Sequence, residues 1–97
     1  MPKQLYMIVE RFRDARAVYR RFEERGRMAP DGLVYVSSWV DINLERCFQL
    51  METDDRRLID EWMANWSDIV EFEVYPIMSP SEAATMIREA GLDSQNE

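Results

Sequence analysis

The chain has 97 residues, 46% of them hydrophobic, and carries a formal net charge of −7 with a pI near 4.6. This length predicts one domain with a modest core. The negative charge disfavours non-specific binding to nucleic acids and to anionic membranes, and no apolar run approaches the ~20 residues that span a bilayer. No N-terminal signal peptide is recognisable, and the single cysteine, Cys47, cannot form an internal disulfide. We therefore expect a cytoplasmic protein.

The first part of the chain predicts a strand, a helix and a strand. Residues 4–11 are a β-rich run with five consecutive apolar residues at positions 5–9. Asp14 is a good N-cap for a helix that ends near residue 25, with Gly26 as its stop. After a turn at residues 30–32, a strand is expected over residues 33–41. Simple alternation places Tyr35 and Trp39 on the same face of that strand.

The second part predicts a strand, a helix, a strand and a final helix. The short turn at residues 42–45 makes an antiparallel hairpin with a strand over residues 46–53. Asp54 or Asp55 caps a helix running to about residue 66, and a strand follows over residues 69–78. Pro76 in that last strand favours an edge position or the end of the strand's pairing. The capping-box sequence SPSE at residues 79–82 starts a helix that ends at Gly91.

The order β-α-β-β-α-β with a terminal helix predicts an α+β, ferredoxin-like fold. In this fold both internal helices cover one face of a four-stranded antiparallel sheet. We expect a single domain over residues 1–92 and a polar, disordered tail over residues 93–97.

The uncovered face of such a sheet should be polar at every second position, but this sequence is not. The strands at residues 5–9, 33–36 and 47–51 are apolar on both faces, with few exceptions. This predicts an apolar patch too large for a soluble monomer. The simplest cover is the same face of a second copy, which predicts a homodimer. The alternative is a monomer whose terminal helix folds back over the face.

Three segments resemble a known family: RFEERGRMAPDGLVYVSSWVD, RCFQLMETDD and WMANWSDIVEFEVYPI. They resemble a small, mainly bacterial family catalogued as a domain of unknown function, which is similar to the dimeric α/β-barrel superfamily of ferredoxin-like proteins. The resemblance covers residues 5–84 and implies this fold and a dimer. The wider superfamily includes cofactor-independent monooxygenases, haem-degrading oxygenases, isomerases and ligand-sensing domains. Its active residues differ between groups, so no mechanism carries over.

The absence of histidine limits the chemistry most. It removes the usual general base, the usual haem ligand and the commonest zinc ligand. Asp54, Asp55, Asp60 and Glu61 are close in sequence, but Asp60 is predicted to face outward. We therefore expect no metal and no cofactor. Seven of the twelve basic residues lie between positions 11 and 27, but acidic residues interleave with them, which favours a solvated helix face over a nucleic-acid site.

A set of aromatic and polar side chains predicts a pocket for a small aromatic or apolar ligand. Arg27, after the first helix, could anchor an anionic ligand or a carboxylate of a partner. The alternative is that the aromatic residues only form the core. The predicted ligand-binding residues are Tyr35, Trp39, Gln49, Met51, Trp62, Trp66 and Arg27.

Glu52 is the candidate catalytic residue, because it ends a strand with apolar neighbours and a desolvated carboxylate can act as a base. It could equally pair with an arginine such as Arg27. Glu10 invites the same argument more weakly, because a glutamate at a strand end is usually solvated. Cys47 has no histidine to activate it, so we predict a buried, inert thiol.

Three functions follow from these residues. The leading hypothesis is a ligand-binding homodimer that senses, carries or sequesters a small molecule. The second is a cofactor-independent monooxygenase or isomerase, in which Glu52 is the base and Tyr35, Trp39 and Gln49 orient the substrate. The third is a structural or protein-interaction module without a cavity.

Overall fold

The computed structural model describes residues 3–91, which form a four-stranded sheet and three helices. The element order confirms the predicted β-α-β-β-α-β pattern with a terminal helix. The predicted tail at residues 93–97 lies outside the described residues, and so do residues 1–2 and 92 of the predicted domain. No helix within residues 3–91 is long and apolar enough to cross a membrane. The elements are β1 (Gln4–Phe12), α1 (Ala15–Arg25), β2 (Val34–Val40), β3 (Arg46–Thr53), α2 (Arg57–Ala64), β4 (Val70–Ile77) and α3 (Pro80–Glu89).

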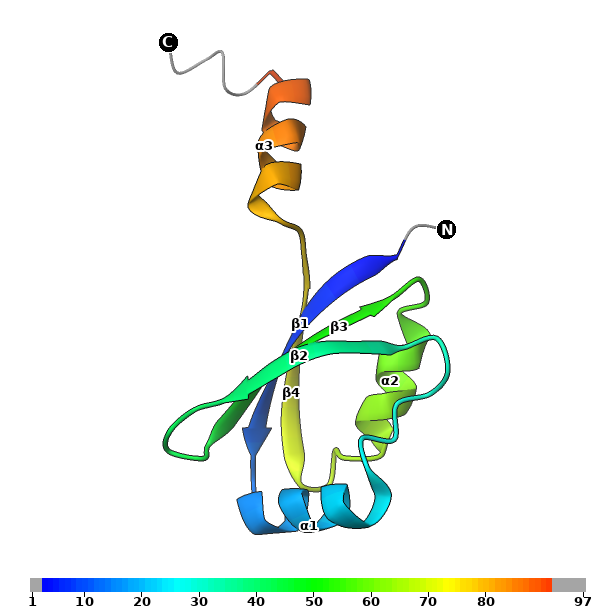
Figure 1. Ribbon diagram of the computed structural model, residues 1–97, viewed down its shortest axis with the longest axis vertical. Coiled ribbons are helices and arrows are strands. Elements are labelled where there is room, and N and C mark those ends of the chain that lie inside the picture. The colour runs from blue at the N-terminus through cyan, green and yellow to red at the C-terminus, as the bar shows by residue number, and fades with distance from the viewer. Residues whose placement is uncertain (1–2, 92–97) are drawn as a thin grey trace.

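The sheet is antiparallel throughout, with the strand order β2-β3-β1-β4 (Figure 1). β4 pairs with β1 alone and is therefore an edge strand, as Pro76 predicted. This order places β1 and β3 in the centre, so the side chains of these two strands that face the helices are the most deeply covered.

Local signals set most of the helix ends. The Asp14 carboxylate accepts the backbone N–H of Ala17 at 3.2 Å, and Gly26 ends α1 with φ 70°. Ser79 forms the predicted capping box at the start of α3. α2 starts at Arg57 and ends at Ala64, so it is shorter than predicted, and residues 65–69 form turns.

The core lies between the sheet and the two internal helices. α1 and α2 pack on the same face of the sheet, with α1 near the end where β1 finishes and β4 begins (Figure 1). From Cys47 to Thr53, β3 alternates between buried and half-buried residues, which is the pattern of a strand with one covered face. The core residues are Ile8, Val18, Leu33, Met51, Ile59, Trp62, Trp66 and Val70.

A β-bulge in β2 changes the face on which its side chains lie. The register shifts between Tyr35 and Ser37, so that Tyr35 pairs with Met51 while Trp39 pairs with Phe48. Tyr35 is therefore on the helix-covered face and Trp39 is on the opposite face. The predicted common face for these two residues is wrong, because the extra residue of a bulge reverses the alternation beyond it.

The face opposite the helices is open and largely apolar, as predicted. Trp39 is 58% exposed and Tyr75 47%, while Leu5, Met7, Val9, Phe48 and Leu50 on the same face are half-buried. We call this surface the open face. α3 projects beyond the end of β4, and none of its residues is buried (Figure 1). The alternative in which the terminal helix folds back over the face is therefore wrong.

Candidate functional site: a pocket between the sheet and the helices

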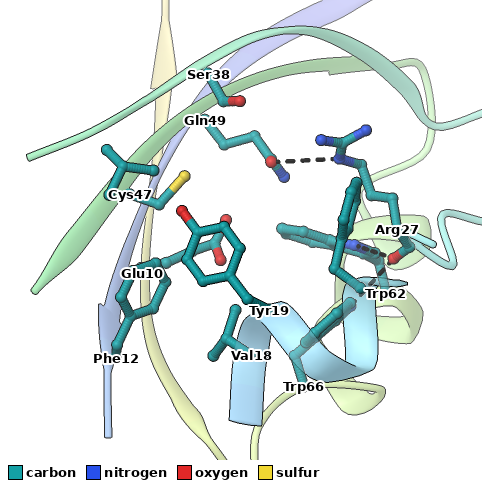
Figure 2. Close-up of a pocket in the computed structure, with 12 residues that line it drawn as sticks. Glu10, Phe12, Val18, Tyr19, Arg27, Ser38, Cys47, Gln49, Trp62 and Trp66 are labelled. Carbon is teal, nitrogen blue, oxygen red and sulfur yellow. Dashed lines mark hydrogen bonds between the residues drawn. The ribbon is translucent and has the colours of Figure 1, made fainter. Parts of the chain in front are cut away.

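A pocket of about 120 Å³ lies between the helix-covered face of the sheet and helices α1 and α2 (Figure 2). For comparison, an engineered apolar cavity of about 150 Å³ holds benzene. The pocket is somewhat smaller than that cavity, so a single aromatic ring is the largest ligand body that its volume suggests. It is lined by Glu10, Phe12, Val18, Tyr19, Phe22, Arg27, Ser38, Val40, Cys47, Gln49, Trp62 and Trp66.

The two tryptophans of the pocket fix the loop after α1. The indole N–H groups of Trp62 and Trp66 both donate to the backbone carbonyl of Arg27, at 3.0 and 3.1 Å. Their spacing of four residues places both indoles on one side of the chain as α2 ends. Asn65 also donates to the carbonyl of Met28, a non-glycine residue with φ 60°. Three side chains near the end of α2 thus hold this loop against the pocket.

Replacing Trp66 with Phe should destabilise the fold by about 1 kcal/mol, because it removes one of two hydrogen bonds to the Arg27 carbonyl and leaves the other in place. The phenyl ring still fills most of the buried space. Urea unfolding of the two proteins measures the difference. A loss of about 3 kcal/mol or more would mean that the ring itself, not the N–H group, dominates the effect.

The Arg27 side chain is a cation held between two aromatic rings. Its Cζ lies 3.7 Å from the ring centroid of Tyr35 and 5.2 Å from that of Phe22. Its Nε donates a long hydrogen bond of 3.4 Å to the amide oxygen of Gln49. Within residues 3–91, no carboxylate forms an ion pair with Arg27, and its two Nη atoms donate no hydrogen bond. These donors are free to meet a ligand.

The carboxyl group of Glu10 lies inside the pocket, close to Tyr19 and Cys47 (Figure 2). Glu10 is only 8% exposed. Burial raises its pKa from 4.5 to about 7, although the charge of Arg27 and a hydrogen bond with Cys47 act in the opposite direction. The pocket therefore contains an acid that changes its charge near neutral pH.

Cys47 is a free, buried cysteine beside Glu10. Burial is the main reason that its pKa rises to about 12, and the neighbouring Glu10 raises it further. A thiol with this pKa stays protonated and is a poor nucleophile at neutral pH. The predicted burial of the Cys47 thiol is confirmed, whereas its inertness stays a prediction.

Four of the seven predicted ligand-binding residues line the pocket: Arg27, Gln49, Trp62 and Trp66. Tyr35 lies next to it, stacked on Arg27. Met51 is fully buried in the core, where its sulfur accepts a hydrogen bond of 3.4 Å from Gln49.

The last predicted ligand-binding residue, Trp39, and the candidate base, Glu52, lie farther away, on the opposite face of the sheet. Trp39 lies on the open face, and so does Glu52, which pairs with Leu5 of β1 and Val34 of β2. Glu52 borders a groove between the end of the sheet and α3. The structure therefore does not bring Glu52 and Trp39 together with Tyr35 and Gln49.

Glu10 is a buried pocket residue, although its place at a strand end predicted a solvated carboxylate. The signal for this burial was its position two residues after Ile8, which places both on the helix-covered face of β1. Its partners across the sheet are Cys47 and Phe72, both on that same face. A central strand covered by helices buries even a glutamate near its end.

The structure is a small α+β domain of ferredoxin-like topology with a pocket between its sheet and its helices. The chain belongs to the family described as "Domain of unknown function (DUF3303)", which matches residues 4–91. No curated protein and no solved structure matches it. The predicted membership in a family of unknown function is confirmed, whereas the similarity to the dimeric α/β-barrel superfamily stays a prediction. Residues 3–91 contain no group of three His, Cys, Asp or Glu side chains suited to a metal ion.

Proposed function

We propose that the protein binds a small aromatic or apolar molecule in the pocket between sheet and helices, and that it senses, carries or sequesters this molecule in the cytoplasm. The observation that carries the proposal is the lining: aromatic rings surround a space of about one ring, with polar groups at only a few points. The five rings are Phe12, Tyr19, Phe22, Trp62 and Trp66.

Tryptophan fluorescence offers a direct test, because two of the three tryptophans line the pocket. A Trp39→Phe background removes the signal of the third, which lies on the open face. We expect benzene and toluene to change the remaining emission in a saturable way.

A matched pair of variants locates the binding. Ser38→Phe fills the pocket from β2, whereas Ser37→Phe makes the same change one residue away on the open face. Binding should be lost in the first and kept in the second. If neither probe saturates, or if Ser38→Phe binds as well as the parent, the pocket is not a ligand site.

We also propose that two copies pack their open faces together as a two-fold dimer, in the manner of a dimeric α/β barrel. The support is the exposure of large apolar side chains on the open face, such as Trp39 at 58% and Tyr75 at 47%. α3 carries further exposed apolar residues, Met86 and Ile87, and could extend the contact. If the purified chain is monomeric, the face would instead suit a different protein, as in the interaction-module alternative.

Leu50→Glu should convert the dimer into a monomer, because it places a charge in the middle of the open face, where Leu50 lies opposite Met7 and Ser37. Light scattering coupled to size exclusion measures the mass, and circular dichroism checks the fold. Ile42→Glu is the control, since Ile42 is 98% exposed in the β2–β3 turn. A parent protein that is already monomeric, or a Leu50→Glu variant that remains dimeric, would contradict the proposed interface.

A cofactor-independent isomerase or monooxygenase remains the second candidate, and one observation favours it. Burial raises the pKa of Glu10 to about 7 inside a pocket, which suits a general base at neutral pH. In this version Glu10, rather than Glu52, is the base. Loss of deuterium from the methyl group of labelled acetophenone, followed by NMR, would reveal proton abstraction. Equal exchange by the parent and by Glu10→Gln would exclude this role.

A further inference from the structure

Arg27 is a partly buried cation beside the pocket that forms no direct ion pair within residues 3–91. Buried and half-buried charges are normally paired, because desolvation is costly. The guanidinium contacts two aromatic rings, donates one long hydrogen bond to Gln49, and interacts with the charge of Glu10 only through space. Its two Nη groups form a flat edge of donors that matches a carboxylate. An anionic ligand would supply the missing partner.

The geometry around Arg27 holds this residue in place before any ligand arrives. Its backbone carbonyl accepts hydrogen bonds from Trp62 and Trp66, and its guanidinium is stacked against Tyr35. A side chain restrained at both ends loses little conformational freedom on binding, which favours affinity. The same indoles that fix the backbone also line the pocket, so an aromatic body and an anionic group would be recognised side by side.

Glu10 is the other charged group of the pocket. The titratable and charged groups near it are Arg27 from the loop after α1, Cys47 from β3 and Tyr19 from α1. Phe72 of β4 and Trp62 of α2 present no charge. When Glu10 is ionised, it offsets the charge of Arg27; when it is protonated, the pocket has a net positive charge and its carboxyl can donate a hydrogen bond.

We propose that the ligand is a small carboxylic acid of about one ring, whose carboxylate pairs with Arg27 and whose binding is coupled to a proton on Glu10. This inference rests on the proposed binding function and adds the chemical class of the ligand. A carboxylate fits better than a phosphate, because the lining residues supply one guanidinium, and the chain contains no glycine-rich phosphate loop.

Four probes of similar size separate the contributions: benzoate, neutral benzamide, toluene and cationic benzylamine. Calorimetry near pH 6 should give benzoate an affinity about tenfold or more above that of benzamide, as one charge-assisted pair with an arginine provides. Benzoate should bind about tenfold more weakly near pH 8.5. At that pH Glu10 is ionised in the free protein and must take up a proton when benzoate binds, although the proton concentration is low.

Variants at Arg27 and at Glu10 assign these effects to their residues. Arg27→Gln should remove the preference for benzoate over benzamide, and Arg27→Lys should restore part of that preference. Glu10→Gln should bind benzoate equally well at both pH values. Arg16→Gln and Glu23→Gln change exposed charges of α1 and should behave as the parent protein.

The outcomes distinguish this inference from the binding function on which it rests. If toluene binds but benzoate gains nothing over benzamide, the carboxylate inference is wrong and the pocket remains a ligand site. If benzylamine is preferred and Glu10→Gln abolishes that preference, Glu10 is the recognised charge and the inference is overturned. If none of the four probes binds, the proposed function itself fails.

Discussion

Replacing Glu10 with Gln should make the protein more stable at pH 8 by about 3 kcal/mol. The reason is the raised pKa of this buried acid, about 7 in the folded protein against 4.5 for an ordinary glutamate. Between these two values the folded state keeps the proton and the unfolded state releases it. The parent protein therefore loses stability as the pH rises from about 4.5 to about 7, and the loss is complete above that range. Glutamine is neutral at every pH, so the variant does not undergo this loss of stability.

The difference between the two proteins isolates Glu10 from the other carboxylates. Arg21, through a hydrogen bond, is the main reason that the pKa of Asp68 falls to about 2, and the pKa values of Asp41 and Asp55 are also lowered. These groups stabilise the fold above their unfolded pKa values and lose that effect as the pH falls, and they do so equally in both proteins. Glu23→Gln, at an exposed position, is the control.

Urea unfolding at several pH values between about 4.5 and 8, at one protein concentration, measures the effect. The stability curves of the parent and Glu10→Gln should converge at the acidic end and separate steadily toward pH 7. Parallel curves would show that Glu10 titrates normally, and the pocket would then be wetter than the structure indicates. That result would also remove the basis for a proton-coupled ligand.

Local sequence signals were sufficient for the element order, because each signal acts within a few residues. Asp14 caps its own helix, Ser79 and Glu82 form a box within one turn, and Pro76 excludes a central strand. The apolar character of both strand faces likewise predicted the open face. Whether a second copy covers it stays a prediction.

The bulge in β2 was not predictable in the same way. No glycine or proline marks it, and the extra residue is set by how β2 pairs with β3. As a result Tyr35 and Trp39, which alternation places together, lie on opposite faces. The prediction that Trp39 lies with the pocket residues is wrong because of this bulge.

The pocket itself depends on contacts between distant parts of the chain. The one-turn spacing of Trp62 and Trp66 was visible in the sequence, but their common acceptor, the carbonyl of Arg27, is 35 and 39 residues away. The burial of Glu10 similarly needs both helices in place over β1. A strand-end glutamate looks solvated until the element that covers it is known.

Trp62→Ala should destabilise the fold by about 3–5 kcal/mol, the usual range for removing a fully buried aromatic side chain. Trp62 is 2% exposed, packs edge-on against Phe72 at 5.4 Å and donates to the Arg27 carbonyl. Because domains of this kind are stable by about 5–15 kcal/mol, the variant loses a large part of its stability. The midpoint of urea unfolding should fall accordingly.

Trp39→Ala is the matched comparison, since it removes the same side chain from the open face, where Trp39 is 58% exposed. In a monomer this change should cost about 0.5 kcal/mol or less. In a dimer joined through the open face, its effect should depend on protein concentration, because dilution favours the dissociated state. The loss in Trp62→Ala should persist at every concentration. If Trp62→Ala is as stable as Trp39→Ala, the core is not centred on α2. If the effect of Trp39→Ala is small and does not depend on protein concentration, that result argues against the dimer.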